Sequence, residues 1–354
     1  MPTPDVVIDD ICTLLETSGV PGYEDRVRKL VIDSLSSSVD RVRTDAMGNV
    51  VGTLEGESSY SVVVAAHMDE IGFMVRHVAA NEDDEFGFLE LDPLGGWDPK
   101  VLTAQRVTVH TDDGDLPGVI GSPPPHTGTD DDGELSIDDL FVDVGLPAAE
   151  VNERVSTGDL VTLERTATTM GETITGKALD DRICLFAMLE AADRLSDPPV
   201  TIHFCATVQE EVGLRGAAAL GVDIDPDQAI ALDVTVANDV PSSKDGERVT
   251  ELGEGVAVKL KDSSVITNPK FNERIRAVAD EREIPYQLEI LPRGGTDTAE
   301  FQRISGAKPV GALSIPTRYL HTTTETAHLE DVEAMIDLLV AVLETEDESH
   351  DYTL

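Results

Sequence analysis

Three short apolar runs constrain the fold of this chain more than any other feature. Residues 61–66, 200–208 and 228–232 are rich in Val, Ile and Ala and are bounded by polar residues. Runs of this length and composition are typical of strands that are buried on both faces, as the strands of a parallel sheet are. Segments with helical spacing alternate with them, at residues 181–195, from residue 213, and at residues 268–283. The sequence therefore predicts an α/β domain whose central parallel or mixed sheet is flanked by helices.

Residues 71–175 have a different pattern. Alternating runs such as QRVTVHT, LFVDVGL and DLVTLERT are separated there by turns rich in Gly, Asp and Pro, and helical spacing is scarce. Helical spacing precedes this segment at residues 5–15 and 23–35, and a last amphipathic helix is expected near 329–343. A chain of 354 residues is also long enough for two domains. We therefore predict a small β-rich domain at 71–175, inserted into an α/β domain made of residues 1–70 and 176–354.

Side chains that can bind metals follow the apolar runs or lie in separate polar motifs. They are two histidines and four carboxylates: His67, Asp180, Glu210, Glu211, Asp233 and His321. In open α/β sheets, chemistry collects at the carboxyl ends of the strands, so the residues that follow the three runs are expected to converge. The set has the composition of a dinuclear zinc or cobalt site, in which one acid bridges two metals and an unused acid moves protons.

Each candidate also has a structural interpretation. His67 could be a hydrogen-bonded core histidine, although Asp69 two residues later favours a metal ligand, because a carboxylate commonly orients a ligating imidazole. Asp180 could cap the helix that follows it. Asp233 could equally be a cap or a ligand. His321 lies in a polar, Thr-rich loop, where an exposed histidine would be ordinary.

Charge and cysteine content restrict the partners and the environment. The formal net charge is -43, from 69 acids against 26 bases, and the acids are spread along the whole chain. Acidic residues in this excess repel one another strongly at low ionic strength. In 1 M salt the screening length falls to about 3 Å and this repulsion largely disappears, so the composition indicates a halophilic protein. No basic face exists for nucleic acid, and no run reaches the ~18 apolar residues of a membrane span. The cysteines Cys12, Cys184 and Cys205 are expected to be reduced thiols, and we place the protein in the cytoplasm.

Two other classes of function remain open on the residues alone. The segment GETITGKA, residues 171–178, follows the spacing of a phosphate-binding P-loop, but Ala178 stands where a hydroxyl would hold Mg²⁺, and Glu172 would lie beside phosphate. Glu210 and another acid could instead form the carboxylate pair of a metal-independent glycoside hydrolase. That interpretation leaves His67 and His321 without a role.

Six strings occur in an order that resembles a known family. They are AHMDEIGFMV, ALDDR, TVQEEVGLRGA, ALDVT, GGTDTAE and RYLHTTTET. Together they resemble the M42 family of metallo-aminopeptidases, the TET or deblocking aminopeptidases, some of which are labelled endoglucanases. The resemblance covers nearly the whole chain and includes the position of the β-rich insertion directly after HMDE. It implies a zinc-exopeptidase-like α/β fold with an inserted small β-barrel.

The resemblance also implies a set of roles. One metal would be held by His67, Asp180 and Asp233, and the other by Asp180, Glu211 and His321, with Asp180 bridging. Glu210 would be the general base and Asp69 would orient His67. The loop that contains Arg293, Gly295, Thr296 and Asp297 would help to shape the substrate pocket. The resemblance further implies two Zn or Co ions per subunit and short peptide substrates that are cleaved from the amino terminus. It also implies a dodecamer built from dimers, which form through the inserted domain.

Overall fold

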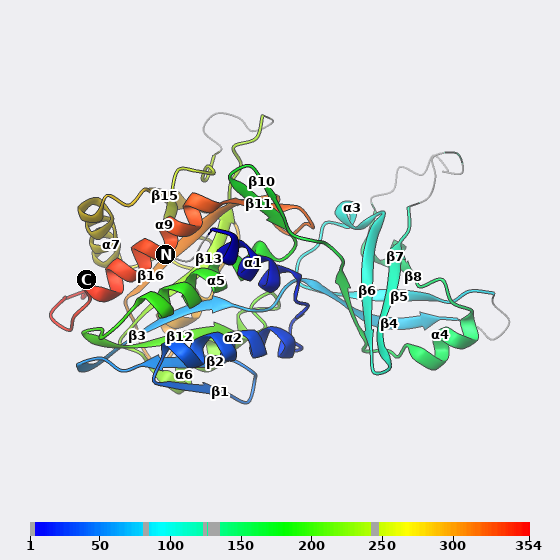
Figure 1. The fold of residues 1–354 in the computed structure, drawn as a ribbon, viewed down its shortest axis with the longest axis horizontal. Coiled ribbons are helices and arrows are strands. Elements are labelled where there is room, and N and C mark those ends of the chain that lie inside the picture. The colour runs from blue at the N-terminus through cyan, green and yellow to red at the C-terminus, as the bar shows by residue number, and fades with distance from the viewer. Residues whose placement is uncertain (1–3, 81–84, 123–125, 127–134, 242–247) are drawn as a thin grey trace. The chain divides into compact units, whose positions relative to one another are not determined.

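The fold is described from a computed structural model that covers residues 4–80, 85–122, 126, 135–241 and 248–354. The chain divides into two compact units, drawn in Figure 1. The larger unit comprises Met1–Asp69, Ala167–Leu320 and Thr324–Leu354, and the smaller one comprises Glu70–Thr166 and His321–Thr323. The predicted insertion extended to residue 175, whereas β10 (Thr168–Met170) and β11 (Thr173–Gly176) pair with strands of the larger unit.

The larger unit is built on one mixed sheet, sheet A. Its main path among the described residues runs β1-β2-β12-β3-β13-β16-β17-β11-β10, and β14 pairs with both β15 and β16. The neighbours β12, β3, β13 and β16 are parallel to one another. The remaining strands are β1 (Arg41–Thr44), β2 (Val50–Leu54), β3 (Ser58–His67), β12 (Val200–Thr207), β13 (Gln228–Val236), β14 (Val256–Lys261), β15 (Tyr286–Ile290), β16 (Val310–Arg318) and β17 (Glu325–His328).

Helices cover both faces of sheet A, which is why its central strands are largely apolar and mostly buried. The core on one face includes side chains of α1, α2, α5, α7 and α9, whereas α6 and α8 pack with the core on the other face (Figure 1). Their bounds are α1 (Pro4–Glu16), α2 (Asp25–Ser38), α5 (Leu179–Arg194), α6 (Arg215–Ile224), α7 (Pro269–Arg282), α8 (Thr298–Arg303) and α9 (Leu329–Glu344). The predicted α/β class with a mixed, parallel-centred sheet is confirmed.

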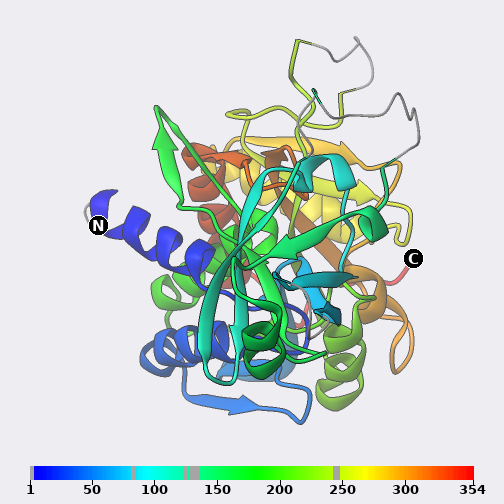
Figure 2. The same ribbon diagram turned by 90° about the vertical axis from the view of Figure 1, so that its right-hand side faces the viewer.

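Among its described residues, the smaller unit forms a closed antiparallel barrel with the strand order β4-β5-β8-β7-β6-β9, coloured light blue to green in Figure 2. Its elements are β4 (Gly72–Ala79), β5 (Phe88–Leu94), α3 (Pro99–Leu102), β6 (Gln105–Thr111), β7 (Gly114–Ile120), the 3-10 helix η1 (Ile137–Asp139), β8 (Phe141–Asp143), α4 (Ala148–Arg154) and β9 (Leu160–Leu163). Phe73, Leu91, Val107 and Val161 are buried in its core. Buried side chains that point into the barrel alternate with more exposed ones along strands such as β6 and β7, and the predicted small β-barrel is confirmed.

A buried arginine holds the start of α5 in place. The Arg182 side chain is fully buried, and its Nη1 donates to the carbonyl oxygens of Leu14, at 2.7 Å, and Thr17, at 2.9 Å. Its Nη2 donates to the carbonyl oxygen of Gly19 at 3.3 Å. The last carbonyls of a helix have no partner within the helix, so this guanidinium satisfies acceptors at and beyond the end of α1. The end of α1 thereby fixes the residues that immediately precede Arg182.

We expect Arg182→Lys to destabilise the fold by about 2–4 kcal/mol, because one ammonium cannot reach three separated carbonyls and leaves buried acceptors unsatisfied. Arg282→Lys is the matched control, since Arg282 is about half exposed and lies 3.7 Å from Glu344. The control should change stability by less than about 0.5 kcal/mol. Urea unfolding of metal-free protein, followed by far-UV circular dichroism, measures both. Equal midpoints for the two variants would contradict the assigned role.

Candidate metal centre

The parallel strands bring the candidate ligands to one edge of sheet A. β3 ends at His67, and its register partner at the end of β12 is Thr207. Glu210 and Glu211 follow β12 after this pair, so neither lies on the strand itself. On the other side of β3, Ala231 of β13 pairs with Ala65, and Asp233 lies two residues further toward the same edge.

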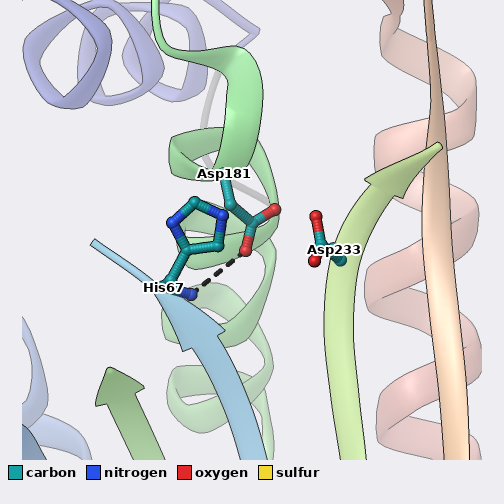
Figure 3. Close-up of side chains that lie close together, drawn as sticks. All are labelled: His67, Asp181 and Asp233. Atoms are coloured by element: carbon teal, nitrogen blue, oxygen red, sulfur yellow. Dashed lines mark hydrogen bonds between the residues drawn. The ribbon is translucent and has the colours of Figure 1, made fainter. Parts of the chain in front are cut away.

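The start of α5 contributes two further carboxylates to this cluster, Asp180 and Asp181. Asp180 (φ −76°, ψ 103°) and Asp181 (φ −118°, ψ 25°) have non-helical backbone angles, and the peptide bond between them is cis. Oδ2 of Asp181 accepts the backbone N–H of His67 at 3.2 Å. Figure 3 shows the Asp181 carboxylate between His67 and Asp233. Oδ1 of Asp181 is buried, and no donor among the described residues contacts it.

The tautomer of His67 follows from its neighbours. Nδ1 lies 3.2 Å from the backbone carbonyl oxygen of Asp69, which can only accept, so Nδ1 carries the proton. Nε2 then faces Oδ1 of Asp180 at 3.1 Å. Two acceptors this close repel each other unless a proton or a cation lies between them. Burial alone lowers the pKa of His67, but the contacts with Asp180 and Asp69 raise it well above its usual value.

Asp69 organises both sides of the cluster. Its carboxylate is fully buried and accepts the backbone N–H of Glu210 at 3.0 Å and that of Glu211 at 3.1 Å. Its Oδ1 also lies 3.5 Å from Nδ1 of His67. One carboxylate therefore holds the loop after β12 against the end of β3. Glu210 is brought to 4.0 Å from His67, measured between Oε2 and Nε2.

Two sets of donor atoms are close enough to share a cation. One atom each of His67, Asp181 and Asp233 lie within 4.8 Å of one another, and the same holds for His67, Asp180 and Glu211. Imidazole nitrogen and carboxylate oxygen are common ligands of zinc in proteins. The sets share His67 and draw on four different carboxylates, which is a donor chemistry suited to divalent cations.

The electrostatics of the cluster also favour cations. Burial raises the pKa of Asp233 to about 8, and the neighbouring Asp180 adds to this shift. Burial raises the pKa of Asp181 well above its usual value, with a further contribution from Asp233. The pKa of Glu210 is likewise raised by burial, against an opposing effect of His67. Several acids in one dry pocket are costly as anions, and divalent cations would remove that cost.

His321 belongs to the smaller unit in the contact-based division of the chain. Its Nδ1 lies 2.7 Å from the backbone carbonyl oxygen of Gly96 in the same unit. Its predicted role as a metal ligand stays a prediction. β16 ends at Arg318, at the same edge of sheet A as β13, because Thr317 pairs with Val236.

The predicted substrate loop has an exposed tip and a buried base. Arg293 and Gly295 are exposed, whereas Thr296 and Asp297 are buried. Oδ2 of Asp297 accepts the hydroxyl of Thr207 at 2.6 Å, so the base of the loop is bound to the end of β12. Burial raises the pKa of Asp297 to about 6, whereas the bond from Thr207 lowers it.

Sequence reasoning missed two carboxylates near the centre. Asp181 was assigned only to the first turn of a helix, yet it is fully buried and contacts His67. Glu325, at the start of β17, accepts the backbone N–H of Asp180 at 3.1 Å. The adjacent acids in ALDDR were a usable signal for Asp181. Nothing local marks Glu325, whose role depends on the pairing of β17 with β11.

The two alternative functions are not favoured. Residues 173–176 of the P-loop-like segment form β11, whose backbone pairs with β10 and β17 and so is not wrapped around a phosphate. Glu210 and Glu211 lie beyond the strand, and Glu211 belongs to a donor set with His67, which a metal-independent carboxylate pair does not need. Within the described residues, no helix combines the length and apolar character required to cross a bilayer.

Comparison with known proteins agrees with this architecture. The family model described as M42 glutamyl aminopeptidase matches residues 48–338. The lysyl aminopeptidase of Pyrococcus furiosus is 40% identical over 339 residues, which cover 94% of this chain and 95% of the relative.

Two solved structures are similar over nearly the whole chain. An aminopeptidase from the archaeon Desulfurococcus kamchatkensis has a TM-score of 0.91 at 37% identity, covering 97% of this chain and 95% of that one. The Pyrococcus horikoshii TET1 peptidase, described as assembling into a tetrahedron or a large octahedral shell, has a TM-score of 0.86 at 31% identity, with 96% and 100% coverage. The chain therefore belongs to the M42 family of aminopeptidases.

Proposed function

We propose that this chain is an aminopeptidase that removes amino-terminal residues from short peptides with the help of two divalent cations, Zn²⁺ or Co²⁺. The observation that carries the proposal is the clustering of one imidazole with four carboxylates at the carboxyl edge of sheet A. M42 aminopeptidases are metal dependent, and the donor set fits that requirement.

We assign the first cation to His67, Asp180 and Asp233, and the second to Asp180, Glu211 and His321. The 3.1 Å contact between Asp180 and Nε2 of His67 supports a bridging place for Asp180. Asp181 already accepts a hydrogen bond from the backbone of His67, which favours a positioning role for it at the first cation. His321 enters this assignment through the family resemblance, and its origin three residues beyond β16 is compatible with it.

When bound, the two cations would polarise the scissile carbonyl group and lower the pKa of a water molecule at the site. Glu210 is the general base that takes a proton from this water. Its carboxylate is held near His67 by the hydrogen bonds that the loop backbone donates to Asp69, and burial raises its pKa. The same carboxyl group then delivers the proton to the departing amine, so one residue serves both halves of the reaction.

We assign substrate contacts to the loop that carries Arg293, Gly295, Thr296 and Asp297. The exposed tip is available to a peptide, whereas the buried base is fixed through the bond between Asp297 and Thr207. Thr207 is the register partner of His67. The base of the loop is therefore attached to the strand end next to the ligating histidine, which keeps its position relative to the cations constant.

A pair of neighbouring substitutions tests the division of labour. We expect Glu210→Gln to bind two equivalents of Zn²⁺ but to lose about 10²–10⁴-fold in kcat, because the amide cannot accept the proton. Glu211→Gln should instead lose metal as well as activity, because it removes a ligand. Metal content by mass spectrometry and hydrolysis of aminoacyl-p-nitroanilides measure the two effects.

Chelation provides the control for this test. Prolonged treatment with a chelator should abolish hydrolysis by the wild-type protein, and Zn²⁺ or Co²⁺ should restore it in wild type but not in Glu210→Gln. Turnover by Glu210→Gln near the wild-type rate would remove Glu210 from the mechanism. Activity that is indifferent to chelation would remove the metals.

We further propose that the protein works in the cytoplasm at high salt as a dodecamer built from dimers, with the β-barrel of the smaller unit forming the dimer contact. The three cysteines form no disulfide, as expected in a reducing compartment. The net charge of -43 would oppose assembly at low ionic strength, because subunits of like charge repel one another. Salt at about 1 M screens this repulsion.

Light scattering at two ionic strengths tests the assembly. In 2–3 M KCl the expected mass is that of twelve 38.0 kDa chains, and at ~0.05 M KCl the expected species are smaller. A monodisperse monomer at both salt concentrations would reject the proposed assembly while leaving the catalytic proposal intact.

A further inference from the structure

The smaller unit contains a histidine whose tautomer is set by a backbone carbonyl. Nδ1 of His321 lies 2.7 Å from the carbonyl oxygen of Gly96. A carbonyl oxygen only accepts, so Nδ1 must be the protonated nitrogen. In a neutral imidazole with its proton on Nδ1, the lone pair that can bind a metal is on Nε2.

The same arrangement, in which a backbone carbonyl contacts Nδ1, occurs at His67 in the metal centre. Nδ1 of His67 lies 3.2 Å from the carbonyl oxygen of Asp69, and its Nε2 faces Asp180. Two histidines from different units are therefore oriented by backbone carbonyls through the same ring nitrogen. Partners of this kind fix the ring and raise its basicity as a ligand.

The carbonyl of Gly96 is itself held by the barrel. The next residue, Trp97, donates its Nε1–H to the carbonyl oxygen of Gly72 at 3.2 Å. Its indole stacks on Phe73, with ring centroids 5.3 Å apart and 17° between the planes. Phe73 is fully buried in the barrel core. The position of the Gly96 carbonyl is thus set by core packing of the smaller unit.

Gly96 also allows the imidazole to approach the backbone closely. A Cβ atom at this position would lie 3.3 Å from Nδ1 of His321 and 3.5 Å from its Cε1. A larger side chain would push the ring away from its place. The glycine therefore favours the contact by leaving room for the ring, and not by adopting an unusual backbone angle.

From these contacts we infer that Gly96 is a positioning residue of the second metal site: its carbonyl holds His321 in the tautomer that binds a cation through Nε2. The inference rests on the proposed function, in which His321 is a ligand. It extends that function by making the filling of one cation site depend on the packing of Trp97 in the barrel.

Two substitutions at Gly96 and a matched control test the contact. Gly96→Ala adds a methyl group at the edge of tolerance, and Gly96→Val adds a branched side chain against the ring. Gly121→Val is the control, because a Cβ at Gly121 has open space around it in the same unit. We expect the second equivalent of Zn²⁺ to bind about 10–100-fold more weakly in Gly96→Val, less so in Gly96→Ala, and normally in the control.

The variant His321→Asn tests the roles of the two ring nitrogens separately. An asparagine amide can place its N–H near the position of Nδ1, and it tolerates the positive φ of 57° at this residue. The variant should retain the bond to Gly96 and the thermal stability of the metal-free protein, yet bind only one Zn²⁺. Two bound Zn²⁺ in this variant would show that the second ion does not need Nε2 of His321 and would overturn the inference.

Metal stoichiometry is measured by equilibrium dialysis against defined free Zn²⁺, and Trp97 provides a second readout because it is the only tryptophan in the chain. Its fluorescence should respond to the second equivalent of Zn²⁺ in wild type and not in Gly96→Val. Wild-type affinity in Gly96→Val overturns this inference alone. Fewer than two Zn²⁺ in the wild-type protein overturns the proposed function as well.

Discussion

The metal centre depends on a single electrostatic constraint: several buried or partly buried carboxylates lie together at one edge of a sheet. Asp180, Asp181, Glu211 and Asp233 all contribute donor atoms within a few ångströms of His67. Burial, with a further contribution from the neighbouring Asp180, raises the pKa of Asp233 to about 8, so without positive charge between them such groups take up protons. The fold tolerates this arrangement because the surrounding elements leave the carboxylates little freedom to move apart.

That restraint comes from elements that are distant in the sequence. The parallel pairing of β12, β3 and β13 fixes the positions of His67 and Asp233. Arg182 anchors the start of α5 to the end of α1, and Asp69 holds the loop after β12 by two backbone hydrogen bonds. Residues that never touch a cation in the proposed mechanism therefore determine where the ligands are, and they account for much of the precision that a two-cation site requires.

The sequence was sufficient to predict the sheet and the residues that follow its strands, because short apolar runs bounded by polar residues are typical of buried parallel strands. It was insufficient where the position depends on long-range pairing. Asp181 was missed because a helix start explains an acid equally well, and Glu325 because its contact with Asp180 requires β17 to pair with β11. The limit of the insertion was also placed too late in the chain, since β10 and β11 continue the run of short strands but pair within sheet A.

Anomalous X-ray scattering at the zinc edge, from crystals grown with Zn²⁺, tests the central claim most directly. The account predicts two peaks per chain, about 3.5–4 Å apart. One should contact His67 and Asp233 and the other Glu211 and Nε2 of His321, with Asp180 between them. A single peak, or peaks remote from His67, would contradict the account.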